Sequence, residues 1–168
     1  DEIIPWLKKL TTECHDLGSK VMIQITHLGR RTNWNHSDWL PVVSASGVRE
    51  PAHRAFPKEA EDWDIERIIN DYAETAQRMK EANMDGVEIE AYGHFLDSFW
   101  SPATNKRLDK YGGKLDNRIK FSNQVINAVR KAVGKDFIVG LRMVADEDWD
   151  KGISKKEGLE IVKKIIGT

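Results

Sequence analysis

The chain repeats apolar residues at helical spacing in four segments, and each repeat places its apolar residues on one face of a helix. These segments are residues 5–17, 65–79, 119–133 and a last one that begins near residue 154. Residues suited to capping stand at their limits: Gly18, Asp62 or Asp64, Gly134, and the capping box Ser154 and Glu157. The pattern therefore predicts four amphipathic helices.

Three short, nearly continuous apolar runs alternate with these helices, at residues 21–25, 87–91 and 137–143. Such runs are typical of parallel strands that helices cover, so the alternation predicts an α/β fold. Residues 31–61 and 92–116 show no period and are expected to form long loops. Because three strands cannot close an eight-stranded barrel, the chain forms either an open three-layer sheet or the middle of a barrel.

The composition is that of one globular domain with little net charge. Of the 168 residues 40% are hydrophobic and 32% are charged, and the formal net charge is −1. This balance gives no electrostatic reason to expect nucleic acid or an anionic membrane as a partner, so a small molecule is expected. The single cysteine and the lack of an apolar run of about 20 residues favour the cytoplasm. Because the sequence starts on Asp1 and stops just after a helix, we expect a piece of a longer protein.

Polar clusters follow the three predicted strands, and parallel α/β folds keep their sites at this edge of the sheet. The clusters are Gln24 with His27 and Arg30, Glu90 with Tyr92 and His94, and Arg142 with Asp146 and Glu147. The amide of Gln24 and the guanidinium of Arg142 together suit a flat polar heterocycle that gains negative charge. Tyr92 and His94 could relay a proton, and Glu90 is a carboxylate that needs a partner.

Each of these residues also has a structural interpretation. Gln24 and Arg142 could satisfy backbone carbonyls or pair with carboxylates. Tyr92 and His94 could be rim residues held by hydrogen bonds, and Glu90 could form a salt bridge with a lysine or arginine.

Residues with metal-ligand chemistry do not form a recognisable pattern. His27 could bind a ligand, yet one histidine at a strand end is more often a packing residue held by hydrogen bonds. Cys14, His15, His36 and His53 do not match a metal-binding spacing, so we assign no metal. Neither the phosphate-loop pattern nor G-x-G-x-x-G occurs, which argues against a P-loop or dinucleotide-binding fold.

Four motifs follow one another along nearly the whole chain: QITHLGR at residues 24–30, VEIE at 87–90, SPATNKRLDKYGGKLDNR at 101–118 and VGLR at 139–142. The most distinctive pattern is made of Asn105, Arg107, Asp109, Tyr111, Gly112, Gly113, Asn117 and Arg118. Because these motifs occur in this order and with this spacing, the chain resembles the old yellow enzyme family of FMN-dependent NADH:flavin oxidoreductases.

The resemblance implies that residues 1–168 are a fragment of a single FMN-binding TIM-barrel domain, supplying about its third to fifth strands with flanking helices. It implies that Gln24 contacts the flavin ring and that Arg142 approaches the N1/O2 edge of the ring. A reduced flavin carries negative charge near N1 and O2, which a fixed guanidinium stabilises. NADH or NADPH is implied as the electron donor.

The segment after VEI departs from the family pattern. Many members have a histidine directly after VEI, then an asparagine or histidine, a glycine and a proton-donating tyrosine, whereas here Glu90, Tyr92 and His94 take these places. A carboxylate suits a cation better than an enone oxygen. We therefore predict that Glu90, Tyr92 and His94 serve catalysis on an amine, as in the N-demethylase and amine-dehydrogenase branches. An ene-reductase that acts on activated alkenes with NAD(P)H is the alternative.

Two other classes of function stay open. The chain could be a non-catalytic α/β scaffold that binds a partner through the loop of Trp34 and Trp39, or part of a barrel enzyme that uses phosphate or a metal without flavin. The presence of both Gln24 and Arg142 favours the flavin enzyme. Because much of the flavin pocket lies outside this sequence, we expect the chain alone to be inactive. Uncovered strand edges are expected to make it self-associate.

Overall fold

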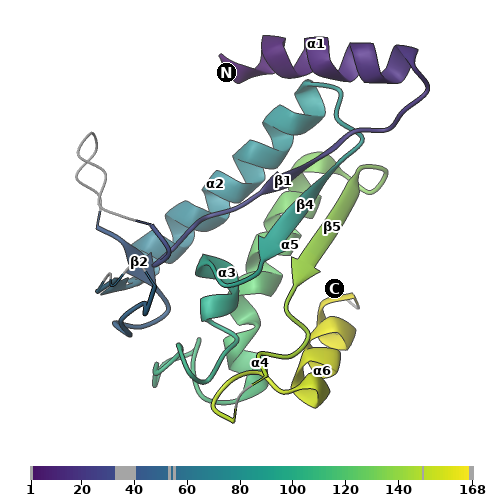
Figure 1. Cartoon of the computed structure of the whole chain (residues 1–168). Helices are drawn as coiled ribbons and strands as arrows, with labels where there is room; N and C mark the ends of the chain where they lie inside the picture. The colour runs from purple at the N-terminus through teal and green to yellow at the C-terminus, as the bar shows by residue number, and fades with distance from the viewer. Residues whose placement is uncertain (1, 33–40, 53, 55, 149, 167–168) are drawn as a thin grey trace.

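The computed structural model describes residues 2–32, 41–52, 54, 56–148 and 150–166. Within them, a parallel sheet contains, in spatial order, β1 (Met22–Ile25), β4 (Gly86–Ala91) and β5 (Ile138–Met143) (Figure 1). β1 and β5 lie within predicted apolar runs, β4 begins one residue before its run, and the pairing is parallel throughout. The predicted α/β sheet is therefore confirmed.

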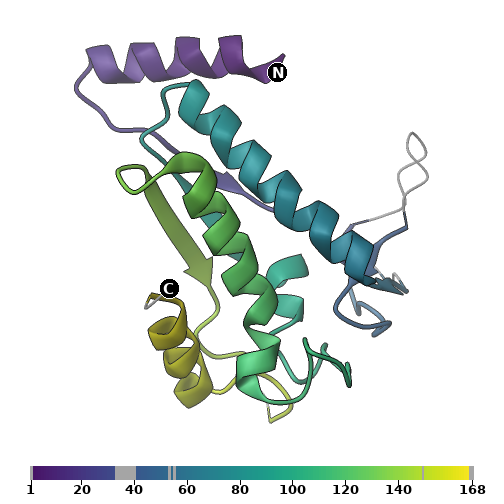
Figure 2. The ribbon, with the colours of Figure 1, turned by 180° about the vertical axis from the view of Figure 1, so that it is seen from behind.

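The four predicted helices are also confirmed, as α1 (Ile3–Asp16), α2 (Asp62–Glu81), α5 (Lys120–Val133) and α6 (Lys155–Ile166). Helices α2 and α5 pack side by side over one face of the sheet, as Figure 2 shows from behind. Helix α1 lies across the end of α2. No helix in the described part of the chain is long and apolar enough to cross a membrane.

The amino-terminal cap of α2 lies one residue before Asp62 and three residues before Asp64, the two predicted positions. Glu61 is the N-cap, not Asp62 or Asp64, and the carboxylate of Asp64 accepts the backbone N–H of Glu61 at 2.9 Å. Lys58 donates to the same carboxylate at 2.8 Å and so holds Asp64 at the third helical position. A capping box therefore forms between Glu61 and Asp64, because Lys58, which lies before the helix, holds the carboxylate of Asp64 in place.

Only half of the capping box predicted for α6 forms. Ser154 Oγ accepts the backbone N–H of Glu157 at 3.3 Å. The carboxylate of Glu157 pairs with Arg118 instead of returning to the start of the helix. A buried arginine outside the helix competes for this glutamate, which local sequence does not reveal. Gly18 and Gly134 end α1 and α5 as predicted, with φ of 76° and 80°.

The two predicted loops contain short elements that the sequence pattern does not indicate. The described part of the first holds β2 (Val43–Ser44) and β3 (Lys58–Glu59), which pair in parallel, while Trp34 and Trp39 lie outside the described residues. The second holds α3 (Phe95–Ser98) and ends at α4 (Leu115–Arg118). Elements of two to four residues are too short to show a period, and α3 is buried at every position.

The two faces of the sheet have different surroundings. Val87, Ile89 and Ala91 of β4 are fully buried in the core beneath the helices. Glu88 and Glu90 point to the opposite face, because side chains alternate along a strand. No helix among the described elements covers that opposite face (Figures 1 and 2). In a closed barrel this would be the inner face.

Candidate functional site

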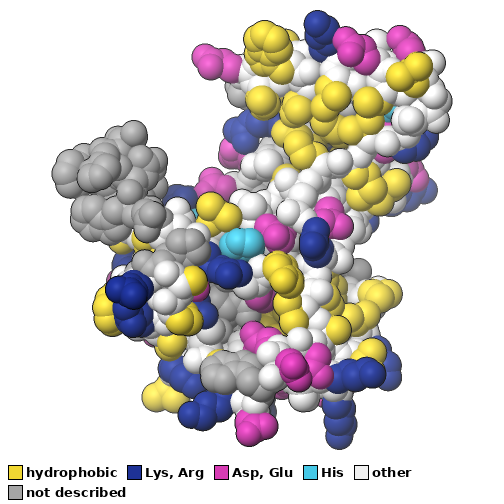
Figure 3. Space-filling model, in the orientation of Figure 1, with side chains coloured by type: hydrophobic (Ala, Val, Ile, Leu, Met, Phe, Trp, Pro, Cys, Tyr) yellow, Lys and Arg dark blue, Asp and Glu magenta, His cyan; other side chains and the backbone are white. Residues whose placement is uncertain are grey.

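Two rows of side chains cross the uncovered face of the sheet near the carboxyl ends of its strands. In the lower row Gln24, Glu88 and Gly140 are partners in register. In the upper row Glu90 of β4 is the partner of Arg142 of β5. Figure 3 shows a histidine side chain with acidic and basic side chains around it over the end of β4. The fold therefore brings three of the predicted site residues to one edge of the sheet.

Gln24 is exposed, and its amide N–H donates to Glu88 Oε1 at 2.6 Å. An ionised carboxylate only accepts hydrogen bonds, so the nitrogen of the Gln24 amide must face Glu88. Gln24 therefore does pair with a carboxylate, as its structural interpretation predicts, but with only one of its amide groups. The carbonyl oxygen and the second N–H of the amide have no partner among the described residues.

Arg142 is exposed beside the ring of Tyr92, with its Cζ 5.7 Å from the ring centroid. Among the residues that the structure describes, its guanidinium donates no hydrogen bond and makes no ion pair within 4.0 Å. This includes Glu90, its partner in register. Five N–H donors thus remain free to bind a ligand at the strand ends.

Glu90 and His94 form a close pair, with 3.4 Å between Glu90 Oε2 and His94 Nδ1. Glu90 is 8% exposed. Within the described chain no lysine or arginine forms an ion pair with Glu90, so the structure does not show the salt bridge that was its structural alternative. His94 Nδ1 is buried and has no hydrogen-bond partner of suitable geometry there. The pair therefore places a buried carboxylate, without a lysine or arginine partner in the described chain, beside a buried imidazole nitrogen.

The segment that carries Tyr92 and His94 is held by a carboxylate that the sequence did not single out. Asp97 accepts the backbone N–H groups of Gly93 at 2.5 Å and His94 at 2.8 Å. Burial raises the pKa of the Asp97 carboxyl. Gly93 has φ of 72°, a left-handed conformation that favours glycine. Tyr92 itself is 48% exposed at the rim of this turn.

His27 is a packing residue, as its structural interpretation predicts. The backbone N–H of Gly29 donates to His27 Nδ1 at 3.1 Å, and the ring lies 4.8 Å from that of Phe95. Burial, with the nearby charge of Arg67, lowers the pKa of His27 to about 4. The imidazole is therefore neutral at pH 7. Arg30 is likewise structural, donating to the carbonyl of Val48 at 3.2 Å.

The acidic pair that follows β5 also has a structural role. Glu147 accepts from Ser101 Oγ at 2.6 Å and from the backbone N–H of Ile153 at 2.7 Å. Asp146 accepts the backbone N–H of Asp148 at 2.9 Å. The bond from Ser101 ties the segment after β5 to the loop after β4, and the other two bonds hold the segment after β5 itself.

The most distinctive motif of the sequence forms a buried scaffold rather than the site. Arg107 uses all three side-chain nitrogens: it donates to the carbonyls of Ala45 at 3.0 Å and Ala60 at 2.7 Å, and to both oxygens of Asp109. The amide of Asn105 donates to the carbonyls of Phe99 and Tyr111, and Arg118 donates to those of Gly113 and Trp100. The motif fastens β2 and β3 to the loops beside the site.

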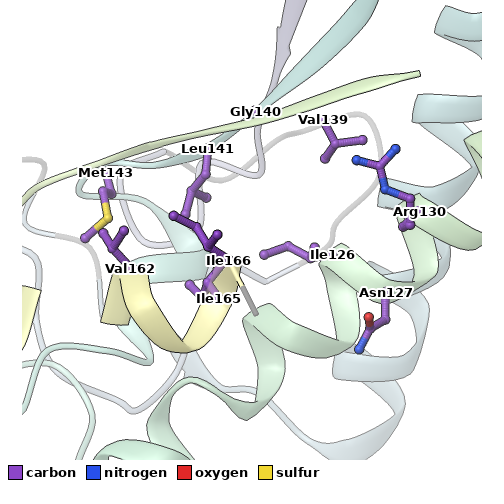
Figure 4. A pocket seen from close by; sticks show the side chains of 10 residues that line it. All are labelled: Ile126, Asn127, Arg130, Val139, Gly140, Leu141, Met143, Val162, Ile165 and Ile166. Atoms are coloured by element: carbon purple, nitrogen blue, oxygen red, sulfur yellow. The ribbon is translucent and has the colours of Figure 1, made fainter. Parts of the chain in front are cut away.

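Two apolar grooves lie along the free edges of the sheet, away from Glu90 and His94. One, of about 440 Å³, is lined by β5, α5 and α6, and Figure 4 shows Val162 and Ile165 of α6 facing Met143 and Leu141 across it. The other, of about 350 Å³, runs between β1 and α2. Such grooves follow from strand edges that have no neighbouring strand. Among the described residues no group of three or more metal-ligating side chains could hold an ion.

Sequence reasoning missed two residues that organise the site. Glu88 stands two positions before Glu90 and therefore on the same face, a signal that the alternation of strand side chains already contained. Asp97 lies in a four-residue helix that has no periodic pattern, so nothing in the sequence marked it.

A family model described as the NADH:flavin oxidoreductase / NADH oxidase family matches residues 1–167. The chain is 56% identical over 165 residues, 98% of its length, to a protein of Rhizobium meliloti named "probable N-methylproline demethylase". It is 47% identical over 155 residues, 92% of its length, to an "N,N-dimethylglycine/sarcosine dehydrogenase" of Chromohalobacter salexigens. The structure of old yellow enzyme from Pichia sp. AKU4542 matches 99% of the chain with a TM-score of 0.87 and 26% identity.

The chain spans only part of these relatives: 24% and 22% of the two bacterial proteins and 47% of the old yellow enzyme structure. It is therefore a portion of the relatives' fold. The solved relatives are TIM barrels, and the parallel strands described above make this chain part of such a barrel.

Proposed function

Because the chain belongs to the NADH:flavin oxidoreductase / NADH oxidase family, we propose that its parent protein is an FMN-dependent oxidoreductase. It passes a hydride between flavin N5 and a small organic substrate. An activated alkene would be reduced with electrons from NADH or NADPH, whereas an amine would itself give the hydride to the flavin, whose electrons then pass to an electron acceptor. Residues 1–168 supply about the third to fifth strands of its single TIM-barrel domain.

The observation that carries this proposal is the pair of unpaired polar groups at one edge of the sheet. Gln24 offers a carbonyl oxygen and an N–H, and Arg142 offers its whole guanidinium. Gly140, two residues before Arg142 on β5 and in register with Glu88, adds no side chain to this face of the sheet. A flat heterocycle with polar edges, such as the ring system of FMN, fits this combination of donors and space.

The chain's own residues would bind and stabilise the cofactor. When bound, FMN supplies the atom that takes up or releases the hydride. Arg142 would stabilise negative charge at the N1/O2 edge, because a fixed guanidinium costs no reorganisation as the charge develops. Gln24 would hold the ring through its free amide groups.

For the substrate, we propose an amine, which places the parent protein in the N-demethylase or amine-dehydrogenase branch. Glu90 is buried without a lysine or arginine partner among the described residues, and such a carboxylate is stabilised by a cation. A protonated amine would supply that cation. The names of the two bacterial relatives point the same way, since N-methylproline, dimethylglycine and sarcosine are all N-methylated amines.

His94 and Tyr92 would serve proton transfer beside the substrate. His94 Nδ1 lacks a hydrogen-bond partner in the described structure and lies 3.4 Å from Glu90, so it can accept a proton in contact with a carboxylate. Tyr92 is half exposed at the rim. Its phenol also supports the second candidate, an ene-reductase, in which a proton donor is needed for an activated alkene.

A direct test uses the full-length protein that carries this chain. The purified protein should show an FMN absorption spectrum and oxidise an N-methylated amine, and Glu90→Gln should lower kcat/KM for the amine about 100-fold or more, in line with loss of a charged contact. Glu74→Gln on α2, which removes an exposed carboxylate, is the matched control and should change nothing. Rapid reduction of activated alkenes by both forms, with unchanged amine turnover in Glu90→Gln, would instead identify the ene-reductase.

Three further expectations concern the chain by itself and its location. We propose that the isolated chain is inactive, since it contains only part of the barrel, and that its free strand edges at β1 and β5 make it self-associate. Light scattering that shows a monomer would contradict the second expectation. The single cysteine, Cys14, supports the cytoplasm as the location of the parent protein.

A further inference from the structure

We propose that Glu88 is a positioning residue that fixes the amide of Gln24 toward the flavin and lowers the reduction potential of the flavin. The inference rests on the proposed function, because it concerns how this chain holds FMN. It assigns a role to a residue that the sequence analysis did not select as a site residue.

The geometry fixes which groups of Gln24 stay free. Gln24 and Glu88 are partners in register on adjacent strands, and their side chains are joined by a bond of 2.6 Å. Because the carboxylate can only accept, the amide of Gln24 cannot turn over without placing two oxygens against each other. One N–H is thereby committed to Glu88. The carbonyl oxygen and the other N–H of the amide are left as a free acceptor and a free donor.

An acceptor and a donor on one amide can each bind a group at the edge of a ring that presents N–H and C=O, as the pyrimidine part of a flavin does. A glutamine without the carboxylate could present either end of its amide and would lose part of its binding energy in becoming ordered. Glu88 therefore pre-organises Gln24. Gly140, the other partner of Glu88 in register, has no side chain to compete for the carboxylate.

The charge of Glu88 has a second consequence. In the described part of the chain no lysine, arginine or histidine forms an ion pair with Glu88, so its negative charge is not neutralised by a neighbour. A flavin gains negative charge when it is reduced. A nearby carboxylate disfavours this reduction, whereas the guanidinium of Arg142 in the adjacent row favours it. The two rows of the site therefore act in opposite directions on the reduction potential.

The experiment compares Glu88→Gln with the unmodified full-length protein. The readouts are the dissociation constant of FMN and the midpoint potential of the bound flavin. Glu88→Gln should weaken FMN binding about tenfold and favour the reduced flavin about tenfold, which is about 30 mV to higher potential for a two-electron couple. Glu88→Asp keeps the charge but withdraws the acceptor, so it should weaken binding with a smaller change in potential.

Glu81→Gln is the matched control, because Glu81 accepts a similar bond from Gln77 at 3.0 Å on the exposed side of α2. It should leave both readouts unchanged. A Glu88→Gln protein whose affinity and potential equal those of this control would overturn the inference.

A double-mutant cycle tests whether Glu88 acts through Gln24. In a Gln24→Ala background, Glu88→Gln should no longer weaken FMN binding, while the change in potential should remain. An undiminished loss of affinity in that background would refute the positioning role. If the unmodified protein binds no FMN, the proposed function fails and this inference with it, whereas bound FMN that is indifferent to Glu88 overturns the inference alone.

Discussion

Two arginines of this chain lie in motifs of the same family resemblance but have opposite surroundings. Arg107 is buried and all three of its side-chain nitrogens donate to groups of its own chain. Arg142 is exposed at a strand end and contacts the ring of Tyr92 without a hydrogen bond among the described residues. A polar group satisfied by its own fold holds structure, whereas one left unsatisfied at a strand end is available to a ligand.

The comparison shows that the most recognisable motif does not supply the polar side chains that are left without partners at the candidate site. The scaffold of residues 101–118 satisfies buried carbonyls in loops that have little regular structure of their own. Gly112 belongs to it for space, since a Cβ there would come 2.0 Å from the carbonyl oxygen of Arg107. Such close packing demands specific residues and so produces a distinctive pattern. The candidate site at the strand ends needs only a few side chains whose hydrogen-bonding groups have no partner in the described chain.

The largest effect on stability is expected from Arg107→Ala. The substitution leaves the buried carbonyls of Ala45 and Ala60 without donors and removes the partner of Asp109. We expect the free energy of unfolding of the full-length protein to fall by about 3–5 kcal/mol. Urea denaturation measures this fall. Lys106→Ala, a neighbouring exposed cation, is the control and should cost no more than about 0.5 kcal/mol. Equal effects of the two substitutions would break the comparison.

The next largest effect is expected from pH, through His27. Its folded pKa of about 4 lies below the ordinary value of 6.5, so the unfolded chain takes up a proton first as the pH falls. The stabilising contribution is thus fully present above about pH 6.5 and is lost as the pH falls toward 4. Between pH 7 and pH 5 the loss amounts to about 2 kcal/mol.

Denaturation of the full-length protein and of His27→Gln at both pH values isolates this contribution. Other groups titrate in both proteins, so the difference in their pH dependence belongs to His27. We expect the variant to be less stable at pH 7 and to lose about 2 kcal/mol less on acidification. If the free energies of unfolding of the two proteins changed equally with pH, the fold would not hold His27 neutral. His27 would then resemble the polar side chains of the site that have no partner.

Most of the fold follows from the sequence because its signals are local. The helices and strands appear in the period of apolar residues, and Gly18 and Gly134 end their helices as predicted. The features that the sequence did not predict correctly depend on residues outside the element concerned or on burial. The cap of α2 depends on Lys58, the incomplete capping box of α6 depends on Arg118, and α3 depends on burial alone.

The candidate site divides in the same way. The sequence predicted that Gln24, Glu90 and Arg142 lie at the carboxyl-terminal edge of one sheet. The register places Glu90 beside Arg142 and places Gln24 beside Glu88 in the adjacent row. The sequence could not distinguish His27, which packs, from His94, whose Nδ1 is left without a partner in the described structure, because both are single histidines after a strand. Only the contacts made by each ring separate them. The catalytic roles of Glu90, Tyr92 and His94 stay predictions.

The smallest effect on stability is expected at the other arginine. Arg142→Ala removes a side chain whose described contact is a ring at 5.7 Å, so the free energy of unfolding of the cofactor-free protein should change by no more than about 0.5 kcal/mol. FMN binding should nevertheless weaken at least tenfold, about 1.4 kcal/mol, because the donors that the fold leaves free are lost. Arg142→Lys keeps the charge without the planar fork, and should recover part of the affinity. Denaturation and FMN titration of the same proteins measure both quantities.

A loss of stability as large as that of Arg107→Ala would mean that Arg142 serves the fold. Unchanged FMN affinity would mean that an unsatisfied arginine at a strand end does not by itself mark a binding site.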